Sequence, residues 1–451
     1  MLVVSGLLLA APAAAQGEAA AAPEETLSAA APSASPEDAS ALPGMAPAPR
    51  ETKEVKAEPP SVISAEWQFL TSRAGSVDED VLEMLLEGLG DWVATNPENS
   101  GAAEAQYLKA ALRAKLGDPK GAMTDLLRHF YEYPGASSAE LAQKLFQETV
   151  EKKGDKKLKP ALLELGASSE TGDTPARLAM MLQRVSAQAG QFLYAPLLRE
   201  YRDFFRRYPG FAGGDMLNLA LADLHRANGE YLAARLAYEK TIELYPASPL
   251  IARTKVSLAA TLADNLKDYD GAIAAYQDIA AAFPGTEEAW TAYSRLPALT
   301  ERRDKFALAV EIHEKIIALY PDREEAYASF KAEARVLREE LKNPAAAIAV
   351  LGRLADKYKG ERAIEALFLA AEIARKDLKD MAAEVPLYDR IVAEYPADPQ
   401  APRALFSAGE AYEKAKSYEK ARDYYSAVAG KYSDDPLAKK AQKRMDGLLA
   451  K

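Results

Sequence analysis

The stretch Gly229–Pro246 reads GEYLAARLAYEKTIELYP and predicts one helix. The residues that characterise it are Tyr231, Ala234, Tyr238, Tyr245 and Pro246. Positions three, four and seven residues apart lie on one face of an α-helix, so these side chains form a single stripe. Proline cannot continue a helix, and the terminal Tyr-Pro pair therefore predicts where the helix ends.

The same pattern returns along the chain at a nearly constant spacing. Two further copies are marked by Tyr269, Ala272, Tyr276, Phe283 and Pro284, and by Phe306, Ala309, His313, Tyr320 and Pro321. The prolines Pro209, Pro246, Pro284 and Pro321 follow one another at 37 or 38 residues, and stops in this register run from residue 97 to residue 433. A self-similar period between about 20 and 50 residues is the signature of a solenoid.

A second helix is expected before each striped helix. In three copies it should cover 215–228, 252–266 and 403–415. Two antiparallel helices cannot bury their apolar faces alone, so each pair should stack on the next. The alanine of the stripe is needed where a neighbouring helix crosses closely, since a larger side chain would overpack at roughly 1–3 kcal/mol. The predicted fold class is all-α, an α-solenoid of stacked antiparallel helix pairs.

These units resemble the tetratricopeptide repeat. The fit is closest in the last copy, where Gly409 and Tyr412 fill the first helix and Tyr418, Ala421 and Tyr425 the second. The resemblance implies a right-handed superhelix that holds a protein or peptide partner, with the first helices lining its concave side.

The chain departs from this motif in several places. Its period of 37 or 38 residues is longer than the roughly 34 residues of the motif. Pro297 interrupts a first helix and predicts a kink or a local change of the superhelix. Glu384 stands where alanine is expected, which leaves the packing before Tyr388 open. His313 takes the aromatic place of Tyr238 in its repeat, and we interpret it as a packing residue.

Composition narrows the classes of function. The 451 residues carry a formal net charge of −11 without a basic stripe, which argues against a nucleic-acid partner. The absence of cysteine excludes disulfides, thiolate metal sites and the lipobox of a lipid anchor. No phosphate-binding loop, dinucleotide fingerprint or zinc-protease motif is present. We therefore expect no catalytic residue, no cofactor and no metal ligand.

The chain divides into four parts by composition. Residues 1–15 are expected to be a signal peptide, because the apolar run 2–11 precedes an Ala-rich cleavage site and is too short to span a membrane. Residues 16–60 read as a disordered linker rich in alanine and proline. Residues 61–433 form the repeat array, with a weak unit at 136–171, and residues 434–451 are expected to be a capping helix.

Repeat style and export signal together are similar to those of Gram-negative envelope proteins, namely the BamD type and the YbgF family associated with Tol–Pal. That resemblance implies a periplasmic scaffold, which a partner could bring to the outer membrane. The alternative is a structural subunit of an envelope-spanning motility, secretion or outer-membrane assembly machine that uses its outer surface and ends. An enzyme of unknown type is a third hypothesis, and no residue supports it.

The predicted site is the groove lined by the first helices. By repeat register, its polar residues outside the core are Asp223, Arg226, Thr254, Ser257, Thr261, Asp264, Asn265, Thr291, Ser294, Glu301 and Arg302. They carry no dominant sign, which suits an extended peptide or partner helix held by hydrogen bonds and a few ion pairs. An ordinary solvated face is the alternative interpretation.

Overall fold

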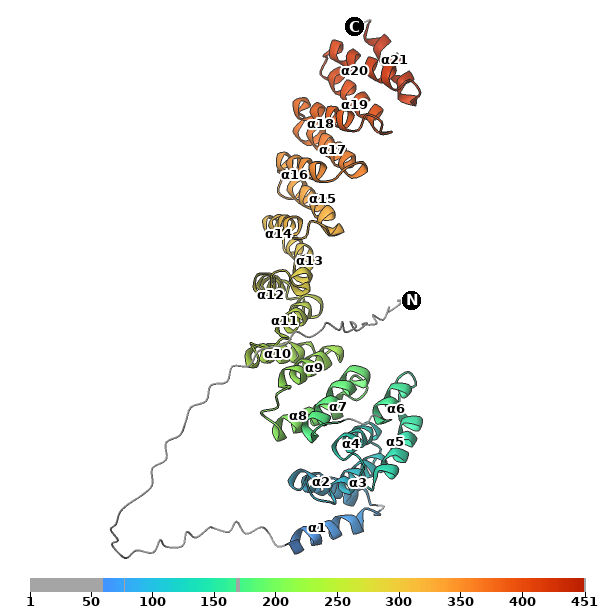
Figure 1. The fold of residues 1–451 in the computed structure, drawn as a ribbon, viewed down its shortest axis with the longest axis vertical. Helices are drawn as coiled ribbons and strands as arrows, with labels where there is room; N and C mark the ends of the chain where they lie inside the picture. Colours follow the sequence, from blue (N-terminus) through green and yellow to red (C-terminus); the bar gives the residue numbers. More distant parts are fainter. Residues whose placement is uncertain (1–59, 77, 168–170, 450–451) are drawn as a thin grey trace, which may run out of the picture. The chain divides into compact units, whose positions relative to one another are not determined.

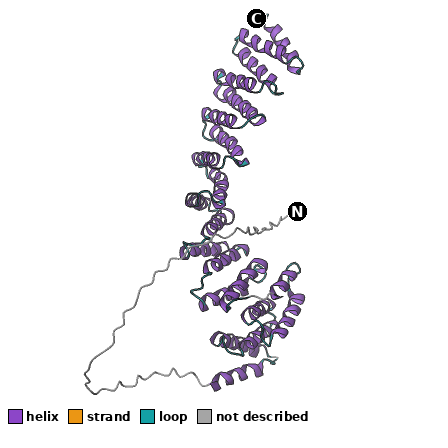
Figure 2. Cartoon of the chain, viewed as in Figure 1, coloured by secondary structure: helices purple, strands orange, loops and turns teal. Residues whose placement is uncertain are grey.

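The computed structural model describes residues 60–76, 78–167 and 171–449. The expected signal peptide and the linker up to residue 59 lie outside these ranges. Residues 61–451 form one compact unit. Within the described ranges every regular element is a helix, as Figure 2 shows, and the predicted all-α fold class is confirmed.

The first eight helices precede the most regular part of the array. They are α1 Pro60–Arg73, α2 Glu79–Thr95, α3 Ala102–Lys115, α4 Pro119–Glu132, α5 Ala139–Lys153, α6 Lys159–Ala167, α7 Thr174–Ala189 and α8 Tyr194–Arg207.

The remaining helices form regular pairs. In two of these pairs the first helix ends in a π-helical turn. They are α9 Gly214–Ala227, α10 Tyr231–Leu244, α11 Ile251–Ala260 with η1 Thr261–Leu266, α12 Tyr269–Ala282, α13 Glu287–Arg302, α14 Phe306–Leu319, α15 Glu324–Glu339, α16 Pro344–Lys357, α17 Glu361–Ile373 with η2 Ala374–Leu378, α18 Met381–Glu394, α19 Ala401–Lys414, α20 Tyr418–Lys431 and α21 Pro436–Leu448.

From α9 to α21 each helix packs against the next one along the chain (Figure 1). The predicted alanine stripe explains how closely they approach, because its members have no exposed surface. These are Ala234, Ala272, Ala309 and Ala421, and Ala347 is equally buried at the same place in α16. Aromatics that end second helices turn back onto the first helix of their own repeat at Tyr320, which packs on Trp290 with ring centroids 4.8 Å apart, and at Tyr358, which packs on Tyr327 with ring centroids 5.3 Å apart.

A left-handed residue makes the turn between the two helices of each repeat. It is Gly229 in one repeat, and a residue with a side chain, such as Lys342 at φ 53°, in the five that follow. An aspartate or asparagine often comes next and caps the second helix, as Asn343 does by accepting a hydrogen bond from the Ala346 N–H over 3.1 Å. The turn residue gives each repeat a common register.

The array is irregular around α4. Helix α4 packs against α5, α6, α7 and α8 as well as α3, and α7 packs directly against α9. The weak unit expected at 136–171 corresponds to α5 and to α6, which has only nine residues. Because α4 is enclosed by neighbours, even polar side chains such as Asp125, Arg128 and Glu132 are buried.

Two departures from the repeat pattern are accommodated without ending a helix. Helix α13 runs through Pro297, and the Thr300 hydroxyl donates to the Pro297 carbonyl over 2.9 Å. Glu384 is buried in the alanine place of α18 and accepts a 3.3 Å hydrogen bond from Tyr388. At the end of the array, α21 packs on α19 and α20 and buries Ala441 and Leu448.

Candidate binding surface

The predicted groove residues on α9 are tied to the repeat itself. The Tyr238 hydroxyl of α10 donates a 2.5 Å hydrogen bond to Asp223, and Arg226 lies 3.8 Å from the same carboxylate. Burial, followed by the nearby Asp223 charge, raises the pKa of Tyr238 above its ordinary value. Arg226 is exposed, so of the two predicted groove residues on α9, Asp223 and Arg226, it is the more accessible to a partner.

Two of the predicted residues are not on a surface. Thr254 and Thr261 have no exposed area. Their hydroxyls donate to backbone carbonyls one turn earlier, Leu250 at 2.8 Å and Ser257 at 2.7 Å. The repeat register placed them in the groove, and the structure corrects this, because small hydroxyl side chains at these positions fit between crossing helices. Ser257 itself is half-buried.

Ion pairs between neighbouring repeats hold further members of the predicted set. Asp264 is paired with Arg295 of the next repeat. Glu301 accepts from the Arg335 guanidinium over 2.6 Å, and the Arg302 guanidinium lies over the Tyr269 ring, 4.5 Å from its centroid. Asn265 and Thr291 are half-buried, and Ser294 is exposed.

Ser294, Glu301 and Arg302 are brought together by the structure at one cavity of about 620 Å³. It is bounded by α13, the inner side of α14 and the facing side of α15. The other eight predicted residues do not line it. The predicted groove is therefore divided along its length, with a hollow at this repeat and mostly paired or buried groups at the two before it.

His313 forms part of the same cavity from α14. As expected, it occupies the aromatic place of its repeat, and it is only 5 % exposed. Neither ring nitrogen has a hydrogen-bond partner. Burial lowers the pKa of His313 to about 4, against the opposing effect of Glu301, so the imidazole is neutral near pH 7.

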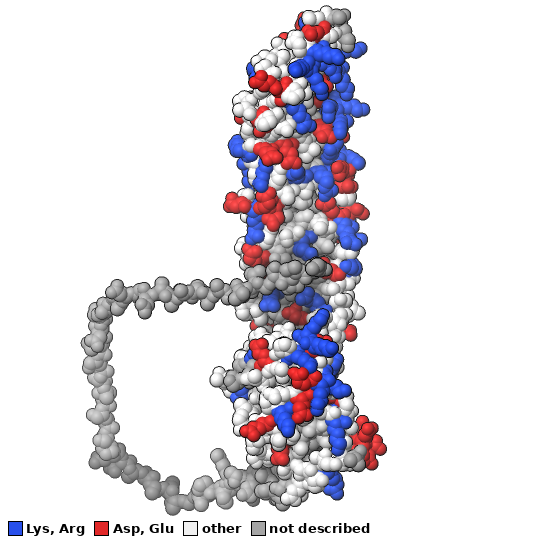
Figure 3. Space-filling view, turned by 90° about the vertical axis from the view of Figure 1, so that its right-hand side faces the viewer, with Lys and Arg blue, Asp and Glu red and all other residues white. Residues whose placement is uncertain are grey.

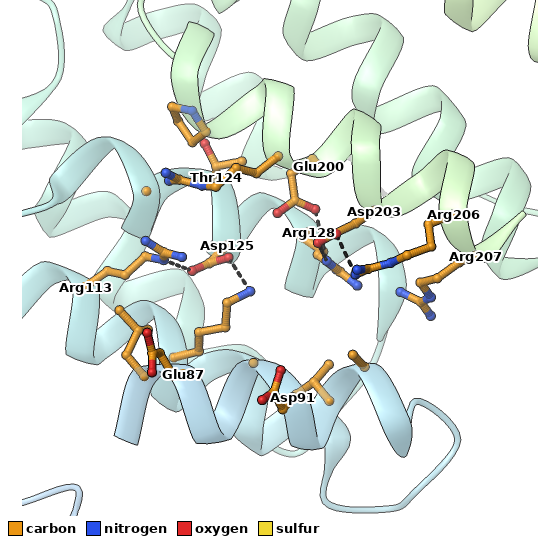
Figure 4. A pocket seen from close by; sticks show the side chains of 18 residues that line it. Glu87, Asp91, Arg113, Thr124, Asp125, Arg128, Glu200, Asp203, Arg206 and Arg207 are labelled. Atoms are coloured by element: carbon orange, nitrogen blue, oxygen red, sulfur yellow. Dashed lines mark hydrogen bonds and ion pairs between the residues drawn. The ribbon is translucent and has the colours of Figure 1, made fainter. Parts of the chain in front are cut away.

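A charged cluster that the sequence did not reveal lies on and around α4, and Figure 4 draws the part of it that lines a pocket, with Arg128, Glu200 and Arg207 labelled. Arg128 donates to Glu132 over 2.6 Å and to Glu200 of α8 over 3.1 Å. Arg207 also reaches Glu132, at 2.7 Å. Burial opposes ionisation of Glu132, but the two arginines outweigh it and hold its pKa below the ordinary value. At Glu200 burial prevails and raises the pKa.

The cluster continues onto α3 and borders a cavity of about 510 Å³. Asp125 accepts from Arg113 over 2.6 Å and lies 2.9 Å from the Lys109 ammonium. Because its cations and carboxylates are matched in this way, we interpret the cluster as structural: it satisfies the charges enclosed where α3, α4 and α8 meet. The feature of the sequence that could have indicated this cluster is the set of polar residues along α4, since a buried helix carries such residues only when they are paired.

Charges of both signs are interspersed over the face drawn in Figure 3. A third cavity, of about 830 Å³, lies between the last repeats and is lined by Arg375, Lys376, Lys379 and Lys414 together with Glu384 and Glu410. No group of three or more acidic or histidine side chains suited to a metal ion occurs among the described residues. None of the described helices is both long and apolar enough to cross a membrane.

The comparison with protein families decides the nature of these helix pairs. The model of the tetratricopeptide repeat matches residues 219–287, 332–399 and 397–436. The chain contains tetratricopeptide repeats. The matched segments run from within α9 to the start of α13 and from within α15 to the start of α21. Residues 288–331, which carry most of α13, all of α14 and the first half of α15, lie between them. Tetratricopeptide repeats are characteristically protein-interaction modules without catalytic activity.

Solved structures of other repeat proteins are similar at low identity. A tetratricopeptide repeat protein from Parabacteroides merdae is 13 % identical over 59 % of this chain and 98 % of its own, with a TM-score of 0.31. Yeast Tom70 is 15 % identical over 88 % and 90 %, with a TM-score of 0.24. The yeast Sti1 TPR2AB domain, solved in complex with pHSP90, is 12 % identical over 60 % and 97 %, with a TM-score of 0.29. No curated protein matches the sequence.

Proposed function

We propose that this protein is a scaffold of the cell envelope that holds a protein or peptide partner on the first-helix side of its tetratricopeptide repeats. The observation that carries the proposal is the cavity between α13 and α15, where the hollow of the array coincides with predicted groove residues. Stacked helix pairs offer extended binding surfaces of this kind. The mixed polar and apolar lining of this cavity suits a peptide that is held by a few hydrogen bonds and ion pairs.

The envelope location rests on the sequence. An apolar run at 2–11 followed by an Ala-rich site is the pattern of a secretory signal, and a proline-rich stretch follows it. We propose that the mature protein lies in the periplasm and reaches the outer membrane, where it does so, through its partner. Mass spectrometry of the protein from the envelope fraction tests this: a mature N-terminus near residue 16 is expected, and a retained Met1 would contradict it.

Binding is tested with two variants of matched charge. Arg302→Glu with Glu325→Lys reverses two exposed residues of the cavity, and Glu311→Lys with Lys315→Glu reverses two exposed residues of α14 outside it. Each pair leaves the net charge unchanged. The proteins are used as bait in native envelope extract, after thermal unfolding has shown that both variants fold.

A partner recovered by the wild type and the α14 variant, and reduced about tenfold or more with the cavity variant, supports binding on the first-helix side. Equal recovery by all three proteins would move the interface to the ends or the other faces. That outcome would favour the structural-subunit alternative.

A further inference from the structure

The repeat register pairs His313 with Tyr425 of the last repeat. Each lies nine residues after the left-handed turn residue of its own repeat, Asp304 or Lys416. Glu301 and Glu413 lie three residues before the same turn residues. The two pairs are therefore equivalent positions on equivalent helices, and their contacts can be compared directly.

The hydrogen bond that Tyr425 makes has no counterpart at His313. The Tyr425 hydroxyl donates to Glu413 over 2.9 Å. At the equivalent place the His313 Nε2 atom lies 4.0 Å from the Glu301 Oε1 atom, too far for a hydrogen bond. Imidazole is shorter than phenol, so the space of a ring edge and hydroxyl is not filled from within this repeat. Arg335 donates a hydrogen bond to one carboxylate oxygen of Glu301. The other oxygen accepts no hydrogen bond from the described residues of the protein.

The open space is continuous with the cavity of about 620 Å³. Its walls combine the Trp290 ring and the Pro297 ring with small side chains on α13 and α15, Ala298, Ala328 and Ala332. Facing surfaces of small residues leave room for an inserted planar side chain. Burying an aromatic ring here gives the apolar contact that anchors a peptide.

The charges of the cavity select what can enter. The cavity is lined by the carboxylates of Glu301 and Glu325 and by Arg302. Arg335 pairs with Glu301, and the Arg302 guanidinium lies over the Tyr269 ring of the preceding repeat. Carboxylates accept hydrogen bonds and do not donate. A group that binds the free oxygen of Glu301 must therefore bring a donor.

We propose that this cavity binds a tyrosine side chain of the partner, whose hydroxyl donates to Glu301 in place of the hydroxyl that His313 lacks. The proposal rests on the scaffold function above and names the residue that the first-helix surface recognises. The partner's phenol would reproduce in trans the contact that Tyr425 makes with Glu413 in cis. A phosphorylated tyrosine would have no phenolic hydroxyl to donate to Glu301.

The test uses the full-length protein and three capped tripeptides, acetyl-Gly-X-Gly-amide, in which X is tyrosine, phenylalanine or phosphotyrosine. The chain has only three histidines, so the ring-proton NMR signal of His313 is assigned from a variant. We expect this signal to move during titration with the tyrosine peptide, with a millimolar dissociation constant. The phenylalanine and phosphotyrosine peptides, which lack the phenolic hydroxyl, should both bind several-fold more weakly.

Two variants and a control make the result specific. His313→Tyr supplies the missing phenol from within the repeat, and Ser294→Trp blocks the rim of the cavity. Ala307→Trp places the same ring at an exposed position of α14 outside the cavity. Tyrosine-peptide binding, followed for all variants by backbone amide signals, should be lost in the first two and retained in the third.

Three results would overturn the proposal: no movement of the His313 signal up to about 20 mM tyrosine peptide, equal binding of tyrosine and phenylalanine peptides, or retained binding in folded His313→Tyr protein. Failure here is distinguishable from failure of the scaffold function. An envelope partner that is still captured by the His313→Tyr protein would leave the scaffold in place and remove only the tyrosine pocket.

Discussion

Tyr238 and Asp223 join the two helices of one repeat through a hydrogen bond of 2.5 Å. The tyrosine ring is fully buried in the stripe of α10, and the carboxylate lies partly exposed on α9. The stripe residue thus has two separate contributions: its ring fills the space between helices, and its hydroxyl fixes the first helix against the second.

The two contributions of Tyr238 can be separated by mutation. Tyr238→Phe keeps the ring and should cost about 1 kcal/mol of unfolding free energy, since Asp223 remains accessible to water. Tyr238→Ala should cost about 3–5 kcal/mol, because it also leaves a cavity. Urea unfolding followed by circular dichroism measures both. Equal losses in the two variants would contradict the packing assignment of the ring.

The left-handed turns predict a stabilising substitution. Lys342 adopts φ 53°, which is unfavourable for a residue with a Cβ atom and readily adopted by glycine. Lys342→Gly should therefore raise the unfolding free energy by up to about 1 kcal/mol. Lys315→Gly, inside α14, serves as the control and should lower it by about 1 kcal/mol. A loss of stability in both variants would be evidence against strain at the turn.

The buried cluster around α4 predicts a strong and asymmetric effect. Arg128→Met leaves the buried Glu200 carboxylate without its closest cation and removes one of two cations from Glu132. The expected cost is about 3–5 kcal/mol. Arg206→Met breaks the exposed pair with Asp203 and should cost less than about 1 kcal/mol. Chemical unfolding of both proteins checks the difference; similar losses would place the cluster in a solvated environment.

Glu333 predicts a pH dependence of stability. Burial, with repulsion from Glu314 and against the pull of Arg353, raises the pKa of Glu333 to about 7. Between the ordinary pKa near 4.5 and about 7 the folded state binds the extra proton, so this residue's contribution to stability falls as pH rises through that window and is constant above it.

Glu333→Gln removes this titration. The variant should gain stability relative to the wild type as pH rises from about 4.5 to about 8, by about 3 kcal/mol in total. The difference between the two urea-unfolding curves, measured at several pH values, isolates Glu333 from the other titrating groups. A difference that does not change with pH would show that Glu333 titrates normally.

The repeat fold could be predicted in detail because its signals are local. The alanines at the places of Ala234 and Ala309 are buried as the stripe predicts, and the helix ends fall at the aromatic-proline stops. The candidate site was predicted less well. Ser294, Glu301 and Arg302 meet at a cavity, whereas Thr254 and Thr261 are buried, since repeat register fixes a helix face and leaves open how deeply the neighbouring helix covers it.

The sequence by itself determined the period, the helix pairs and their stripes. These features follow from contacts and backbone preferences within one or two helices. Within a helix, the separation of two residues in sequence fixes their positions relative to each other. Only the tertiary structure decided that Arg128 meets Glu200, 72 residues away, and that the space beside His313 opens between α13 and α15. Both depend on how helices from separate parts of the chain cross, and crossing depends on the side chains of all partners at once.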